Sequence, residues 1–130
     1  MKSLSRHQVI LLHSQLLVET GGADGIRDEG LLDAALDSPY SGFGNTQFYP
    51  TIEARAARLA FGLVNNHPFV DGNKRIGVLA MLVLLDLNDI ALDVTDNDLI
   101  WLGVSLAEGN LDSEGVHDWI KQHTFGKPIG

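Results

Sequence analysis

The feature that most constrains the fold is an apolar, uncharged run of ten residues, Ile76 to Leu85, directly after the cations Lys74 and Arg75. A helix without charge on any side is normally enclosed by its neighbours. The run is about half the roughly 20 residues that a membrane span requires. We therefore expect a helix from Asn73 or Lys74 to about Leu87, forming the buried centre of a soluble protein.

The other apolar stretches have helical spacing, and each follows a residue type that caps helices. We expect an all-α bundle of about six helices, with residues 1–130 forming one domain and 126–130 a flexible tail. The other five helices are expected to start at Ser5, about Asp28, Thr51, Thr95 or Asp96, and Asp112 or Ser113. The expected inner faces are Val9, Leu12 and Leu16 in the first helix, Ile52, Ala56, Leu59 and Leu63 in the third, and Val116, Trp119 and Ile120 in the last.

The segment from Ser38 to Pro50 has no helical period and is rich in Gly, Pro, Asn and aromatic residues. One interpretation is a connecting loop whose aromatic side chains fold into the core. The other is a mobile flap beside an active site, touched by a partner or substrate. Composition alone favours the connecting loop.

Charge and cysteine content exclude several classes of function. The formal charge is −8, and nine acidic residues but no lysine or arginine lie between Arg75 and Lys121. Such a surface would repel a phosphate backbone, so we expect no direct nucleic-acid binding. The absence of cysteine excludes disulfides, thiolate zinc sites and cysteine nucleophiles. No clear signal peptide or membrane segment is present, and we expect a cytoplasmic protein.

The polar segment His67-Pro68-Phe69-Val70-Asp71-Gly72-Asn73-Lys74-Arg75 separates two apolar helices. Asp71-Gly72-Asn73 predicts a tight turn into a helix N-terminus, where free amides and the helix dipole bind anions, phosphate above all. Lys74 and Arg75 add positive charge. Asp71 suits such a pocket if it holds a Mg²⁺ ion that bridges to the phosphates. His67 suits proton removal near neutrality.

Each of these residues also has a structural interpretation. The structural interpretation of His67 is a solvated loop histidine, and that of Asp71 or Asn73 is a helix cap. Lys74 and Arg75 can be a solvated pair, although cations at a helix start oppose the dipole and require an explanation. The residues taken together favour the combined functional interpretation.

The segment resembles the signature of the Fic/Doc family, H-P-F-x-[DE]-G-N-x-R. Lys74 is typical of the death-on-curing (Doc) branch, whereas adenylylating Fic enzymes have glycine there. Those enzymes also carry a second arginine three residues after the first, where this chain has Val78. The likeness extends over nearly the whole chain, through Gly21-Gly22, the 25–32 turn, Tyr49-Pro50 and the acidic 107–109 stretch.

The resemblance implies a fold and a set of roles. His67 would be the base that deprotonates a target hydroxyl, and Asp71 would ligate Mg²⁺ on ATP. Gly72 and Asn73 would form the anion-binding turn, with Lys74 and Arg75 on the phosphates. The flap that docks the target would comprise Ser41, Gly42, Phe43, Gly44, Asn45, Thr46, Gln47, Phe48 and Tyr49, which reverses the interpretation from composition.

The resemblance also implies a reaction and partners. Doc-type toxins transfer the γ-phosphate of ATP to a threonine of elongation factor Tu, arrest translation, and are blocked by a Phd-like antitoxin. Many Fic proteins carry an inhibitory helix, [ST]-x-x-x-E-[GN], whose nearest match here, Thr20 to Gly25, is a poor helix. Adenylylation is the alternative reaction. A non-catalytic partner-binding module is a further alternative, and a metal-dependent nuclease is disfavoured by the charge.

Overall fold

Side-chain caps set the starts of five helices, at positions that the sequence predicts. Ser5, Asp28, Thr51, Thr95 and Asp112 each accept a hydrogen bond from a backbone amide in the following turn. The computed structural model describes residues 1–124, so the expected tail at 126–130 lies outside the described residues. The elements are α1 (Arg6–Thr20), α2 (Glu29–Asp37), a 3₁₀ turn η1 (Ser38–Tyr40), β1 (Gly42–Phe43), β2 (Thr46–Gln47), α3 (Ile52–Asn66), α4 (Asn73–Leu87), α5 (Asp96–Ala107) and α6 (Ser113–His123).

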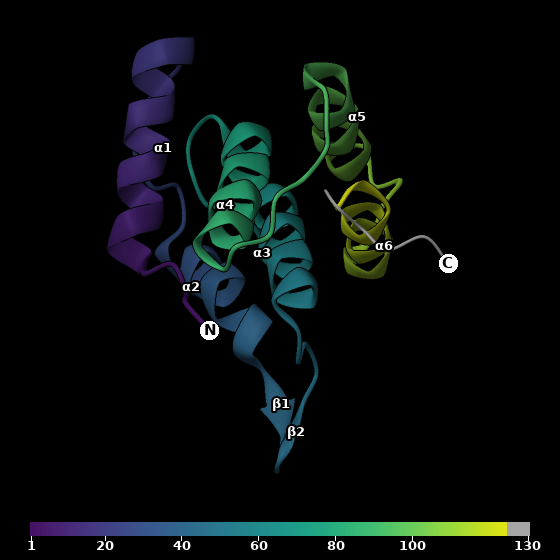
Figure 1. Cartoon of the computed structure of the whole chain (residues 1–130). Helices are drawn as coiled ribbons and strands as arrows, with labels where there is room; N and C mark the ends of the chain where they lie inside the picture. Colours follow the sequence, from purple (N-terminus) through teal and green to yellow (C-terminus); the bar gives the residue numbers. More distant parts are fainter. Residues whose placement is uncertain (125–130) are drawn as a thin grey trace.

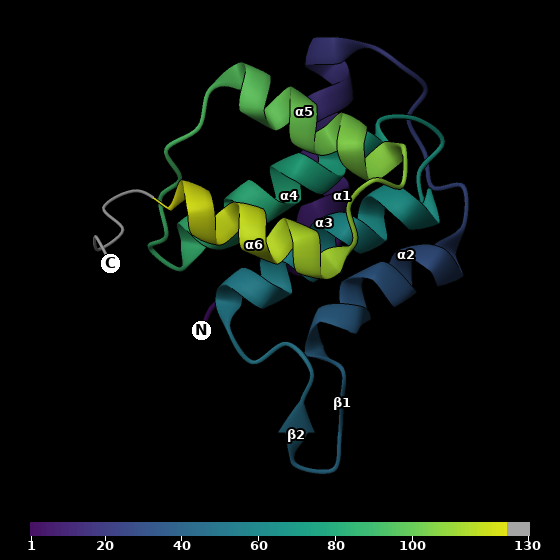
Figure 2. The same ribbon diagram turned by 90° about the vertical axis from the view of Figure 1, so that its right-hand side faces the viewer.

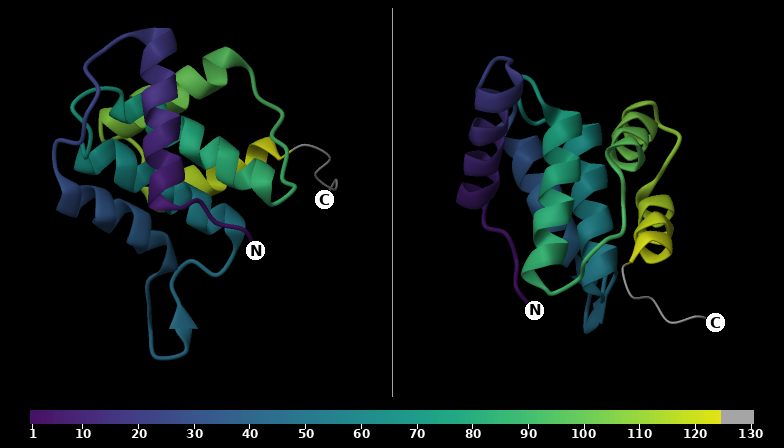
Figure 3. Two further views of the ribbon diagram at one scale, coloured as in Figure 1. Left: turned by 90° about the vertical axis from the view of Figure 1, so that its left-hand side faces the viewer. Right: turned by 45° about the horizontal axis from the view of Figure 1, so that its top comes forward.

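Helices α3 and α4 lie side by side at the centre, between two outer layers (Figure 1). Helices α1 and α2 cover one side of this central pair, and α5 and α6 cover the other (Figure 3). The arrangement confirms the expected all-helical bundle. Within residues 1–124, no helix combines the length and apolarity needed to cross a bilayer.

The centre is shared by two helices rather than occupied by α4 alone. The predicted inner stripe of α3 is fully enclosed, because this helix packs against α2, α4, α5 and α6. On α4, Ile76, Ala80 and Leu84 are buried, whereas Val78 and Leu79 are only partly buried on the side that faces α5. The charge-free run therefore marks the core correctly but also supplies an accessible apolar surface.

A β-hairpin between η1 and α3 is the largest departure from the sequence prediction. Gly42 lies opposite Gln47 and Phe43 opposite Thr46, and the hairpin projects away from the helices (Figure 2). Phe43 is 83% exposed and Phe48 is 59% exposed. The expectation that these aromatic side chains fold into the core is therefore wrong. The short strands pair with each other, and this holds their side chains away from the bundle.

Candidate functional site

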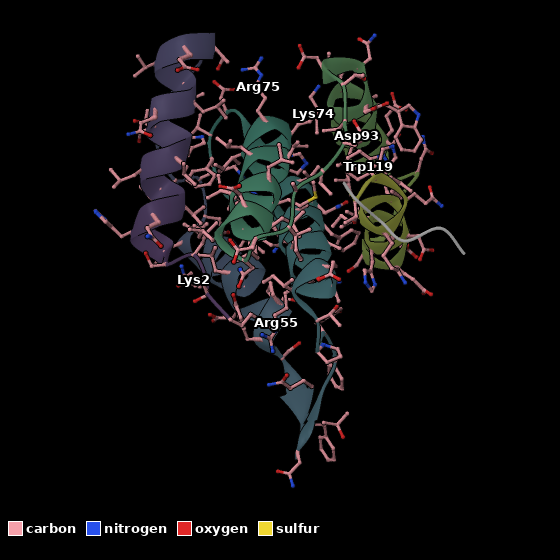
Figure 4. All side chains as sticks on the ribbon, in the orientation of Figure 1. Lys2, Arg55, Lys74, Arg75, Asp93 and Trp119 are labelled. Carbon is pink, nitrogen blue, oxygen red and sulfur yellow. The ribbon has the colours of Figure 1, made fainter. Side chains whose placement is uncertain are left out.

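The His67–Arg75 segment lines a pocket of about 490 Å³ at the N-terminal end of α4. The opposite wall is the end of α1, from Thr20 to Gly22. We call this cavity the α4 pocket. Figure 4 shows Lys74 and Arg75 at the same end of α4, on the far side of the molecule from the hairpin. All six residues to which the sequence assigns nucleotide, metal or proton chemistry line the α4 pocket: His67, Asp71, Gly72, Asn73, Lys74 and Arg75.

Asn73 closes the turn that leads into α4. Its Oδ1 accepts a hydrogen bond from the Phe69 amide at 2.9 Å, and its Nδ2 donates to the Phe69 carbonyl at 3.0 Å. Both bonds are buried, so the Asn73 amide group shapes the loop while its backbone lies at the helix start. Gly72, with φ of +78°, provides the left-handed turn that the loop requires.

The connection between α1 and α2 braces the other side of the loop. The Arg27 and Asp28 amides both donate to the Pro68 carbonyl, at 2.7 and 3.1 Å, and the Val70 amide donates to the Gly25 carbonyl at 3.0 Å. The Arg27 guanidinium donates to the His67 carbonyl at 2.6 Å. His67 itself has left-handed backbone angles, φ 48° and ψ 53°, and an exposed side chain. Its backbone is thus fixed while its imidazole faces solvent at the pocket.

The start of α4 differs electrically from the other helix starts. Gly72 precedes it and supplies no side-chain cap, whereas the other five α-helices described are all capped by a side chain. Its first turn holds Lys74 and Arg75 and no acidic residue. Neither cation forms an ion pair within residues 1–124. Free amides, the helix dipole and two exposed cations therefore converge on a site suited to an anion.

Asp71 is the one carboxylate that lines the α4 pocket. The Ala23 amide donates to its Oδ2 at 2.7 Å, so the orientation of the side chain is fixed and Oδ1 receives no such bond. Among residues 1–124, no group of three or more His, Cys, Asp and Glu side chains could hold a metal ion. Any cation here would need ligands from a second molecule, as Mg²⁺ commonly obtains from nucleotide phosphates.

His13 is a residue that the sequence analysis missed. Its side chain is 1% exposed on the buried face of α1, with Val9 one turn before it and Leu17 one turn after it. Its Nε2 lies 2.6 Å from the Asp71 carbonyl oxygen, and its ring stacks on Phe69 with centroids 3.8 Å apart. Its burial could have been predicted from the spacing of four residues that joins Val9, His13 and Leu17 on one helix face. The more apolar stripe through Leu12 and Leu16 points to a different inner face and hides this pattern.

The hairpin segment, Ser41 to Tyr49, does not line the α4 pocket. It precedes the first residue of α3, and His67 follows the last, so a rigid helix of 15 residues separates the two. At 1.5 Å per residue, this helix spans about 22 Å. Figure 2 shows the hairpin projecting from the other end of α3. In this structure the segment is therefore not adjacent to the α4 pocket, and its role in docking a target stays a prediction.

A second cavity, the apolar pocket, adjoins the first. It has a volume of about 370 Å³ and lies between α4 and α5. Lys74 and Arg75 line both cavities, so they form the boundary between a polar and an apolar compartment. The remaining lining residues are Val78, Leu79, Leu82, Leu99, Ile100, Gly103 and Val104.

Comparison with known proteins agrees with the geometry. A model of the Fic/DOC family matches residues 3–85, which include α1 and the whole His67–Arg75 segment. The protein named Toxin Doc from Mycolicibacterium smegmatis (strain ATCC 700084 / mc(2)155) is 34% identical over 114 residues, which is 85% of each chain. The chain therefore belongs to the Fic/DOC family.

Proposed function

We propose that this chain is the toxin of a toxin–antitoxin system and transfers a phosphoryl group from Mg²⁺·ATP to a hydroxyl on another protein. The observation that carries the proposal is the uncapped, cation-bearing start of α4, with His67 and Asp71 lining the same pocket. The resemblance to a Doc toxin supplies the class of protein.

The phosphates would bind at the start of α4. The amides of the first turn have no intrahelical partner, and Gly72 leaves room for a close approach. Lys74 and Arg75 would compensate the phosphate charge from the boundary between the two cavities. The apolar pocket beyond them fits an aromatic base, because ligand sites are commonly apolar with a few placed polar groups.

The donors present fit a magnesium ion only together with a nucleotide. Asp71 would supply one carboxylate oxygen, and the phosphates would supply others. When bound, Mg²⁺ neutralises charge that develops on the transferred group. Asp71 is oriented for this role by the Ala23 amide.

His67 would remove the proton from the target hydroxyl. Its exposed side chain is accessible to another protein, while the Arg27 contact with its carbonyl fixes its backbone. General-base catalysis of this kind contributes roughly 10²–10⁴-fold to a rate. The base, the metal ligand and the phosphate site would thus act on one bound nucleotide.

Phosphoryl transfer is favoured over adenylylation by two positions in the α4 helix. Lys74 is typical of the Doc branch, and Val78 stands where adenylylating relatives carry a second arginine. In this structure Val78 lines the apolar pocket, so position 78 itself contributes no positive charge to it. Adenylylation is the second candidate.

By resemblance, the proposed target is a threonine of an elongation factor Tu-like protein in the cytoplasm, with translation arrest as the result.

Control would come from a separate, Phd-like antitoxin. The nearest match to an internal inhibitory helix begins at Thr20, where α1 ends. Gly21, Gly22 and Gly25 all have positive φ values, so residues 21–25 form no helix. An external inhibitor is the simpler means of regulation.

The decisive experiment is incubation of the purified protein in a cell lysate with γ-labelled ATP and, separately, with α-labelled ATP. Phosphoryl transfer predicts label from the first alone, and adenylylation predicts label from the second. His67→Ala should abolish labelling without unfolding the protein, and the exposed His7→Ala should serve as the matched control. A His67→Ala variant that still labels its target, or remains fully toxic, would eliminate the enzymatic proposal.

A further inference from the structure

His13 is a polar residue on a helix face where an apolar residue would fit. Val9 and Leu17, one turn away on either side, are both buried hydrophobic residues. Among the buried side-chain nitrogen and oxygen atoms described, His13 Nδ1 is the one without a hydrogen-bond partner. An unpaired buried polar atom costs free energy. A leucine would fill this position without that cost, so stability alone does not account for an imidazole.

The hydrogen-bond pattern determines which ring nitrogen carries the proton. A carbonyl oxygen only accepts hydrogen bonds, so Nε2 must donate to the Asp71 carbonyl across their 2.6 Å separation. Nδ1 faces Asp24, whose nearest carboxylate oxygen is 3.5 Å away. Asp24 in turn accepts hydrogen bonds from the Ser14 hydroxyl and the Gly25 amide. The ring, which α1 carries, therefore lies against both loops that form the site: the one that holds Asp24 and the one that holds Asp71.

The ring also touches the turn at the helix start. A Cβ atom at Gly72 would lie 3.4 Å from His13 Nε2, so the imidazole packs directly under this residue. Stacking on Phe69 places the same ring against the residue that Asn73 clamps. His13 thus contacts three parts of the loop: Phe69, the Asp71 carbonyl and Gly72.

We propose that His13 is a positioning residue for the Asp71–Gly72 peptide. Its Nε2–H fixes the direction of the Asp71 carbonyl, and the Ala23 amide fixes the Asp71 carboxylate. With its carbonyl and one carboxylate oxygen both fixed, Asp71 would offer its other carboxylate oxygen to a metal ion, and the amides that follow would be available to the phosphates. This inference rests on the proposed function, because the groups being positioned are the proposed metal ligand and phosphate donors.

Two substitutions separate the donor from the ring. His13→Phe keeps a flat ring that can stack on Phe69 but has no donor. His13→Gln loses the ring but places an amide N–H within reach of the Asp71 carbonyl. If positioning by the donor matters, Mg²⁺·ATP affinity measured by calorimetry should fall at least about tenfold in His13→Phe. It should stay within about threefold of wild type in His13→Gln.

Val9→Ala is the matched control for a purely structural effect. Val9 is fully buried on the same face of α1, one turn from His13, and its loss should lower the thermal midpoint. We expect Val9→Ala to keep wild-type Mg²⁺·ATP affinity below that midpoint. An affinity loss in Val9→Ala that matches His13→Phe would assign His13 a general packing role and overturn the proposal.

Amide hydrogen exchange in the ligand-free protein tests the same claim without a nucleotide. The amides of Gly72 and Asn73 should exchange faster in His13→Phe and at the wild-type rate in His13→Gln. Unchanged exchange in His13→Phe would overturn the positioning role even if ATP binds normally. If wild-type protein binds no Mg²⁺·ATP, the proposed function fails, while the exchange rates still decide whether His13 orders the loop.

Discussion

At the scale of single residues, Asn73 fixes the shape of the α4 pocket with both atoms of its amide. Asn73→Ala should leave the Phe69 N–H and carbonyl without partners in a region that is buried from water. The expected loss in free energy of unfolding is about 2 kcal/mol, measured by urea denaturation. Asn65→Ala is the control, because Asn65 makes one exposed bond to the Phe61 carbonyl. A loss as small as that of Asn65→Ala would show that Asn73 is not a structural clamp.

Asn73 and His13 show what sequence reasoning can and cannot find at this scale. Asn73 can be identified because it lies inside a dense, ordered signature, although the resemblance assigns it to the anion-binding turn and its side chain bonds Phe69. His13 was missed because one histidine among leucines adds nothing to an apolar pattern. Its role depends on a contact with Asp71, 58 positions away, which no local spacing encodes.

At the scale of elements, the turn into α4 depends on a glycine for two separate reasons. Gly72 and Gly109 have the same φ of +78°, but a Cβ at residue 72 would lie 3.2 Å from Leu17, whereas nothing lies within 4 Å at residue 109. Gly109→Ala should cost about 1 kcal/mol of stability through the left-handed backbone alone. Gly72→Ala should cost about 2 kcal/mol or more, since packing adds to the backbone strain.

Equilibrium unfolding of both variants measures this difference directly, because the effect of alanine on the unfolded chain is the same for each. Gly72→Ala should also weaken Mg²⁺·ATP binding, whereas Gly109→Ala should leave it unchanged. Equal stability losses would mean that the contacts with Leu17 and His13 relax freely and that only backbone conformation selects glycine at residue 72.

Element boundaries were predictable where one local interaction decides them. Thr51 caps α3 and Asp112 caps α6 through bonds to amides three residues away, which short sequence windows contain. The hairpin was not predictable in the same way. Its strands are two residues long, too short for the alternation that marks a strand. Gly44, with φ of +59° at the turn, is the clearest local signal, and it also suits an irregular loop.

At the scale of the whole molecule, the structure separates two surfaces that the resemblance places together. The α4 pocket lies at the end of α3, and the hairpin segment with the exposed Phe43 and Phe48 lies before its start. A target protein that uses both must span about 22 Å, the length of this helix. We therefore propose that the hairpin docks the body of the target, while the acceptor hydroxyl reaches His67 separately.

This separation predicts that docking and nucleotide binding can be altered independently. The double variant Phe43→Ser/Phe48→Ser should modify its protein target at least about tenfold more slowly, because exposed aromatic residues are common anchors of interfaces. Its Mg²⁺·ATP affinity should equal that of wild type, since neither residue lines the α4 pocket or the apolar pocket. Its free energy of unfolding should change by no more than about 0.5 kcal/mol, as expected for exposed positions.

Val18→Ser, which removes an 86% exposed hydrophobic side chain from α1, is the control and should modify the target at the wild-type rate. An unchanged rate in the double variant would show that the target binds near the α4 pocket alone. A matching loss of ATP affinity would instead show that the two ends of α3 are coupled.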